Sequence, residues 1–73
     1  MTLHKSTFGY LKPTDEQMAL MGEAREAAAV FSNQLERLLP EGADKTYLLR
    51  KLREVAMWAN IAITRNSDGS PLA

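Results

Sequence analysis

The pentapeptide PEGAD, residues 40–44, decides the fold because it is a short break between two long helical patterns. Pro40 lacks the backbone N–H that a continuing helix needs, and Gly42 permits a sharp change of chain direction. Asp44 is a favoured N-cap residue for a helix that starts just after it. Because so short a connection leaves its two helices side by side, the sequence predicts an all-α, antiparallel two-helix hairpin.

The helix before the break is predicted over residues 14–39. Its start is marked by TDEQ, residues 14–17, in which Thr14 and Gln17 have the spacing of a capping box. Apolar residues then recur at steps of three and four, which places them in one stripe along the helix; they are Met18, Met21, Ala24, Ala28, Phe31, Leu35 and Leu38. The pattern is typical of an amphipathic helix that packs on one partner.

The helix after the break is predicted over residues 45–65. Its contact with the first helix is expected to come from one seam of apolar residues, namely Leu49, Leu52, Ala56, Ala59 and Ile63. Residues 55–63 are apolar on nearly every side, and a single partner helix covers only one stripe. An uncovered apolar patch marks an interface, so we predict a homo-oligomer whose interface contains Val55, Met57, Trp58, Ala59, Asn60, Ile61 and Ala62.

Two residues of this segment have alternative interpretations. Trp58 is either an anchor at the subunit interface, which we favour because aromatic anchors dominate interface cores, or a platform for a base. Asn60 is either a buried hydrogen-bonding residue that fixes the register of helices, which we also favour, or a ligand contact.

Composition excludes several functional classes. The chain has 73 residues, no Cys, one His and a net charge of zero. No disulfide or thiolate metal site is available, and His4 has no second His or Cys to complete a zinc site. No nucleophile–base pair is evident, so we expect no enzyme activity, cofactor or metal. Zero net charge argues against DNA or RNA as partners, and the apolar run at 55–64 is too short to cross a membrane.

The segments outside the helices complete a single domain over residues 1–66. Residues 1–13 are predicted to form an extended arm, because Gly9 and Pro13 disfavour helix. In an extended chain Phe8, Tyr10 and Lys12 share one side, where they either stack on bases beside a phosphate or fasten the arm to the hairpin. The tail, residues 67–73, is expected to be disordered, and no secretory signal pattern is evident at the N-terminus.

Three stretches resemble the phage anti-CBASS cyclic-oligonucleotide sponges, whose hairpin domain also occurs in anti-Thoeris sponges. They are FGYLKPTDEQ at 8–17, PEGADKTYLLRKL at 40–52 and VAMWANIAITRN at 55–66. The resemblance covers about residues 8–66, and the segment from Met57 to Asn66 is its most specific part.

The resemblance implies a helical hexamer that sequesters cyclic dinucleotides such as cGAMP in the cytoplasm of the infected bacterial host without cleaving them. It also implies a separate site for cyclic trinucleotides. By position, Tyr10 matches the family's base-stacking aromatic, Arg25 a cation on the first helix, and Arg65 the basic residue that reaches phosphates, mainly those of the trinucleotide. Relatives carry a polar residue where this chain has Ala27, which removes a hydrogen bond.

The resulting hypothesis is a sponge that blocks activation of CBASS effectors, with the ligand-binding residues Phe8, Gly9, Tyr10, Lys12, Arg25 and Arg65. Symmetry agrees with it, since a two-fold interface presents each stacking and cationic residue twice to a ligand with two bases and two phosphates. Two other classes stay open at this point: an oligomeric hairpin adaptor that binds a host protein, and a nucleic-acid-binding module.

Overall fold

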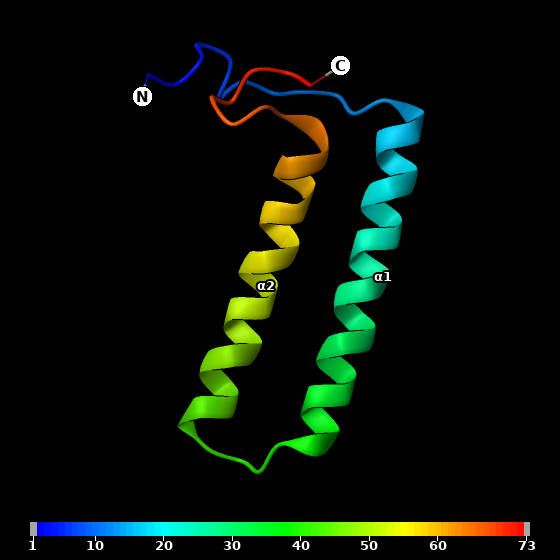
Figure 1. Cartoon of the computed structure of the whole chain (residues 1–73), viewed down its shortest axis with the longest axis vertical. Coiled ribbons are helices and arrows are strands. Elements are labelled where there is room, and N and C mark those ends of the chain that lie inside the picture. Colours follow the sequence, from blue (N-terminus) through cyan, green and yellow to red (C-terminus); the bar gives the residue numbers. More distant parts are fainter. Residues whose placement is uncertain (1, 73) are drawn as a thin grey trace.

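The protein is a pair of antiparallel helices joined by a short turn, as the sequence predicts. The computed structural model describes residues 2–72 and places α1 at Asp15–Leu38 and α2 at Ala43–Thr64. Figure 1 shows the two helices side by side, with the arm and the tail lying together across the end opposite the turn. The pair measures 43 × 28 × 16 Å, so it is one layer of helices.

Local sequence signals set the ends of α1. The predicted capping box is confirmed, because the Thr14 hydroxyl accepts from the Gln17 amide at 3.1 Å and the Gln17 side chain accepts from the Thr14 amide at 2.9 Å. These bonds satisfy two of the donors that a helix start leaves unpaired. The helix ends at Leu38, with Leu39 as its C-cap, just before Pro40.

The start of α2 differs from the prediction that Asp44 caps it. The helix begins at Ala43 with Gly42 as the N-cap and without a side-chain cap, and Asp44 lies in the first turn. A carboxylate in the first turn still interacts favourably with the positive end of the helix dipole. The favourable charge is retained, while the capping hydrogen bond is absent.

The turn is fastened by Lys45, which sequence reasoning did not single out. Its side chain is only 5% exposed, and its ammonium lies 2.6 Å from the Glu41 carboxylate, 3.2 Å from the Glu36 carboxylate and 2.9 Å from the Glu36 carbonyl oxygen. The hydrogen bond that Lys45 donates to the Glu41 carboxylate raises the pKa of Lys45 above its ordinary value, against the opposing effect of desolvation. The ammonium therefore connects the end of α1, the turn and the start of α2.

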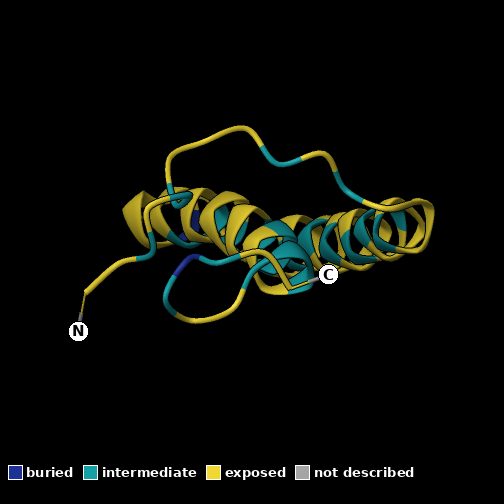
Figure 2. Ribbon diagram, turned by 90° about the horizontal axis from the view of Figure 1, so that it is seen from above, coloured by how far each residue is buried: buried dark blue, intermediate teal, exposed yellow. Residues whose placement is uncertain are grey.

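The interface between the helices is thin. The predicted α2 seam of Leu49, Leu52, Ala56, Ala59 and Ile63 is half-buried, as are Met21, Ala24, Ala28 and Leu35 of α1. Met18, Phe31 and Leu38, which belong to the predicted α1 stripe, are instead largely exposed. Figure 2 shows how little of the described chain is buried, and no apolar side chain within residues 2–72 is fully enclosed.

Much of the segment predicted as an interface, residues 55–62, is exposed to solvent in the single chain. Val55, Met57, Trp58, Ile61 and Ala62 are exposed, whereas Ala59 and Asn60 are half-buried against α1. Trp58 remains 60% exposed. One partner helix thus covers only one stripe of α2, which is the geometric premise of the predicted oligomer.

Replacing Lys45 tests the importance of the turn. We expect Lys45→Met to lower Tm by about 5 °C or more, since it leaves two carboxylates and a carbonyl without their shared donor. Lys51→Met is the matched control, because Lys51 pairs only with Glu54 at 3.2 Å and both side chains are half-exposed. Calorimetry that gives the two variants the same Tm would contradict a structural role for Lys45.

Candidate ligand-binding site

The end of the hairpin opposite the turn is organised by the side chain of Arg65, the C-cap residue of α2. Its Nη1 donates to the carbonyl oxygens of Ser6 at 2.9 Å and Gly69 at 2.7 Å, and its Nη2 donates to the carbonyl of Gly9 at 2.9 Å. A planar guanidinium presents its donors in a fixed fork, which suits carbonyls that come from different segments. Arg65 therefore fastens the arm to the tail. We use the word clasp for these contacts of Arg65 together with the direct contacts of His4 and Thr7 with Asp68 and Gly69.

The arm is folded rather than extended where this clasp holds it. Residues 4–9 form two overlapping turns, in which the amides of Thr7 and Gly9 donate to the carbonyls of His4 and Ser6, each at 3.0 Å. The His4 ring nitrogen Nδ1 also accepts from the Ser6 amide at 3.1 Å. The turns bring the carbonyls of Ser6 and Gly9 toward Arg65, which explains the departure from the extended arm that the sequence predicts.

The tail also has a defined path, in contrast to the expectation of disorder. The Asn66 amide donates to the Ser70 carbonyl at 2.8 Å, and the His4 amide donates to the Asp68 carbonyl at 2.6 Å. Gly69 is buried with a φ of 91°, a left-handed conformation that favours glycine. The tail thus forms a turn whose backbone contacts the arm directly.

Replacing Gly69 is expected to open the clasp. A Cβ on Gly69 would overlap the Thr7 hydroxyl, lie 2.9 Å from the Thr7 Cβ and force a left-handed φ on alanine. We expect Gly69→Ala to accelerate hydrogen exchange at the His4 amide by roughly tenfold. Gly42→Ala is the control, since nothing lies within 4 Å of a Cβ there. Equal hydrogen-exchange rates at the His4 amide in the two variants would contradict the role of Gly69 in the clasp.

Asp68 makes the tail turn sensitive to acid. Its carboxylate accepts from the Ser70 hydroxyl at 2.7 Å and the Ser70 amide at 2.9 Å, and these bonds hold the pKa of Asp68 below its ordinary value of 3.8. Because the pKa is lower in the folded chain, the charged carboxylate stabilises the turn. That contribution is fully present above pH 3.8 and is lost as the pH falls through the folded-state pKa.

An NMR titration tests whether the pKa of Asp68 is lowered in the folded chain. We expect the Ser70 amide resonance to titrate with a midpoint below pH 3.8, because the Asp68 carboxylate that accepts its hydrogen bond becomes protonated there. The chemical shift of the same resonance should not change over this pH range in Asp68→Asn. A midpoint above 3.8 in the unaltered chain would show that the turn does not favour the charged form.

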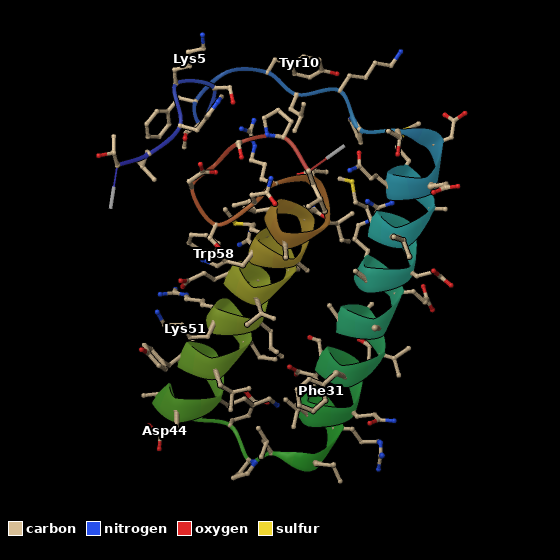
Figure 3. The ribbon with its side chains drawn as sticks, turned by 45° about the horizontal axis from the view of Figure 1, so that its top comes forward. Lys5, Tyr10, Phe31, Asp44, Lys51 and Trp58 are labelled. Atoms are coloured by element: carbon tan, nitrogen blue, oxygen red, sulfur yellow. The ribbon has the colours of Figure 1, made fainter. Side chains whose placement is uncertain are left out.

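The arm holds two aromatic side chains in solvent. Phe8 is 92% exposed and Tyr10 is 90% exposed, although the backbone of the segment between them is fastened through Gly9. Figure 3 shows Tyr10 on the arm, away from both helices. Neither aromatic ring therefore fastens the arm to the hairpin within a single chain.

Phe8 lines a hollow at the end of α2. The hollow has a volume of about 530 Å³ and an apolar wall that also includes Leu3, Trp58 and Ile61, with Arg65 at its edge. Arm, helix and tail all contribute to it, so its shape depends on the clasp. Tyr10 and Lys12 do not line it.

Arg25 lies in a different hollow, on α1. This space of about 270 Å³ is lined by Pro13, Met18, Met21 and Arg25. Within residues 2–72, no carboxylate forms an ion pair with Arg25 or with Lys12. One chain therefore offers a cation and an aromatic arm at the same end of the hairpin, but it does not gather all the predicted ligand residues into one cavity.

The remaining predicted residues have these positions. The side chain of Asn60 makes no hydrogen bond among the described residues, and its backbone carbonyl accepts from the Thr64 hydroxyl at 2.9 Å.

The sequence analysis missed the clasp residues Thr7, Asp68 and Gly69. The signal that could have found the tail turn is NSDGS, residues 66–70, whose Asn, Asp, Gly and Ser are the residue types of turns.

Two further observations limit the chemistry of the described part of the chain. Between residues 2 and 72, neither helix combines the length and the hydrophobicity that a membrane span requires. Over the same range, His, Asp and Glu side chains do not gather in threes as a metal site would need.

Comparison with known proteins identifies the family. The chain matches the family described as Acb2/Tad1, hairpin domain, over residues 3–64. Searches of the curated proteins and of the solved structures gave no significant match. The match spans both helices and most of the arm, and the family implies a phage sponge for cyclic nucleotide signals. The chain therefore belongs to the Acb2/Tad1 hairpin-domain family, the family of anti-CBASS and anti-Thoeris sponges.

Proposed function

We propose that the protein binds cyclic dinucleotides such as cGAMP, sequesters them without cleavage and so prevents activation of CBASS effectors. The observation that carries the proposal is the pair of arm aromatics, Phe8 and Tyr10, which are more than nine-tenths exposed on a backbone held by Arg65. A single chain gains nothing from holding two aromatic rings in water. A ligand with two bases gives both rings a partner.

Stacking supplies the affinity in this proposal. Base–aromatic stacking contributes about 1–3 kcal/mol per base and accepts any base. The clasp restricts the arm before the ligand arrives, so less conformational entropy is lost on binding. Phe8 and Tyr10 are the stacking residues, and the Gly9 backbone between them allows close approach of the ligand.

Phosphate contacts come from Lys12 and Arg25. Both cations are free of carboxylate partners within the described chain, and a guanidinium binds phosphate through charge-assisted hydrogen bonds. In a homo-oligomer, hexameric by family resemblance, a two-fold axis doubles each cation and each aromatic ring. A chain of zero net charge thereby gains a local pocket for two phosphates.

Arg65 has a second role in the proposal. Three of the five N–H donors of its guanidinium go to carbonyls of the arm and tail. The other two can reach a phosphate of a cyclic trinucleotide where copies of Arg65 meet. Ala27 supplies no polar group to that second site, so the dinucleotide is the main ligand. Because the family's signals are made inside the infected bacterium, the proposal includes action in its cytoplasm.

A thermal-shift panel of cyclic dinucleotides, cyclic trinucleotides and linear dinucleotides tests the proposal. At 100 times its Kd, a ligand adds about 2.7 kcal/mol of stability, which corresponds to a rise of roughly 11–22 °C in the Tm of a domain of this size. We expect this rise with at least one cyclic dinucleotide and not with the linear compounds. Chromatography of the bound compound after denaturation should return it intact, because the proposal involves no turnover.

Two variants locate the site. Tyr10→Ala removes a stacking ring and Arg25→Ala removes a phosphate contact, so each should weaken dinucleotide binding at least tenfold. Arg50→Ala is the control, since Arg50 is an exposed arginine of α2 that the proposal does not use. No shift with any cyclic compound would refute the sponge proposal. A full shift in the double variant Tyr10→Ala/Arg25→Ala would place the site elsewhere.

A further inference from the structure

The arm, here residues 2–13, is attached to the rest of the described chain at two residues. Every hydrogen bond that joins the arm to another part of that chain ends on Arg65 or on Asp68. Arg65 donates to two carbonyls of the arm, whereas the Asp68 carbonyl accepts from the His4 amide at 2.6 Å and lies 3.3 Å from the Thr7 hydroxyl. Asp68 belongs to the tail, which lies beyond the residues of the family match.

The tail is itself fastened to the end of α2. The Leu72 amide donates to the Thr64 carbonyl at 2.9 Å, and the Asn66 amide donates to the Ser70 carbonyl at 2.8 Å. These bonds fold residues 66–70 into the tail turn beside the last turn of the helix. Figure 1 shows the tail and the arm together at this end of the hairpin. The tail turn therefore connects the arm to a helix and not to a free chain end.

The tail turn and the arm approach each other most closely at Gly69. This glycine is buried, and a Cβ placed on it would overlap the Thr7 hydroxyl and lie 2.9 Å from the Thr7 Cβ. Its carbonyl accepts from Arg65 at 2.7 Å, the shortest of the three bonds that this guanidinium makes to carbonyls. Gly69 thus contacts the arm directly through Thr7 and indirectly through Arg65.

We propose that the tail turn is a positioning element of the ligand site, in which Asp68 and Gly69 set the affinity for a cyclic dinucleotide by holding the arm in its binding conformation. The inference rests on the proposed function, because it gives the tail the task of placing the stacking residues Phe8 and Tyr10. Asp68 and Gly69 act through the arm, and the aromatic rings make the contacts with the bases.

The location of the two rings explains why the tail contacts matter. Phe8 lies inside the folded segment 4–9, and Tyr10 follows that segment directly, whereas residues 10–13 take part in no hydrogen bond within the described chain. An arm released from the tail samples conformations in which the rings are not placed for two bases. The apparent Kd rises in proportion as the binding-competent fraction of a protein falls. Opening the tail contacts should therefore weaken dinucleotide binding without altering any group that touches the ligand.

A reversible cross-link between the tail and the arm tests the proposal, and the absence of Cys from the chain makes the test clean. In the double variant Thr7→Cys/Gly69→Cys the two Cβ atoms start 2.9 Å apart, so a small movement of the tail brings them to the roughly 3.5–4.5 Å of a disulfide. Oxidation then fixes the tail to the arm. Reduction leaves two side chains that overlap at this point, which opens the clasp.

Calorimetry with cGAMP, cyclic di-AMP and cyclic di-GMP provides the measurement. We expect the oxidised form to bind at least one of them roughly fivefold more tightly than the reduced form does, while circular dichroism shows the same helices in both. The unaltered chain controls for the redox treatment and should bind equally in both buffers. Gly69→Ala should weaken binding as reduction does, and Gly42→Ala should not, since a Cβ there meets nothing within 4 Å. Mass spectrometry establishes that the disulfide lies within one chain.

The outcomes separate this inference from the proposed function. Binding by the unaltered chain, together with equal Kd values for the oxidised and reduced forms, overturns the positioning role and leaves the proposed function standing. A helical double variant that forms no disulfide within one chain shows that Thr7 and Gly69 do not meet, which also overturns it. If the double variant unfolds, the comparison of Gly69→Ala with Gly42→Ala decides, and equal affinities reject the inference. Failure of the unaltered chain to bind any of the three compounds refutes the proposed function and this inference with it.

Discussion

The fork of hydrogen bonds from Arg65 is the interaction on which the functional end of the molecule depends. It joins residues 6, 9 and 69 through one side chain, so the arm and the tail are ordered together. A lysine would supply the charge without the planar set of donors. The position of Arg65 at the C-terminal end of α2 also suits a cation, because the helix dipole is negative there. The exposed aromatics of the arm owe their position to this contact.

The other constraint is the lack of a core. Two helices side by side bury one stripe each, and the described chain encloses no apolar side chain fully. The charged Lys45 is, at 6% exposure, the most buried large side chain. The described chain is therefore fixed at its two ends, by the Lys45 contacts at the turn and by the Arg65 clasp opposite.

Sequence reasoning succeeded where the deciding interactions are local. The capping box depends on residues three apart, and the α2 seam follows from helical periodicity, so both are visible in a linear pattern. The attachment of the arm to the end of α2 depends on hydrogen bonds between residues about 60 positions apart, such as Ser6 with Arg65. No local pattern encodes such a contact. Asp44 was assigned as a cap because propensity favours it, whereas the backbone path of the turn starts the helix two residues earlier than predicted, at Ala43.

The predicted ligand residues do not converge on one hollow within a single chain. Phe8 lies with Trp58 and Arg65 at the end of α2, and Arg25 lies with Pro13 on α1. A site assembled from several copies does not need its residues to converge within one of them. It needs each group to be exposed, held in place and close to a symmetry axis. The clasp meets the first two conditions for the arm and α1 meets them for Arg25, while the face of α2 that α1 leaves uncovered offers a surface at which an axis could form.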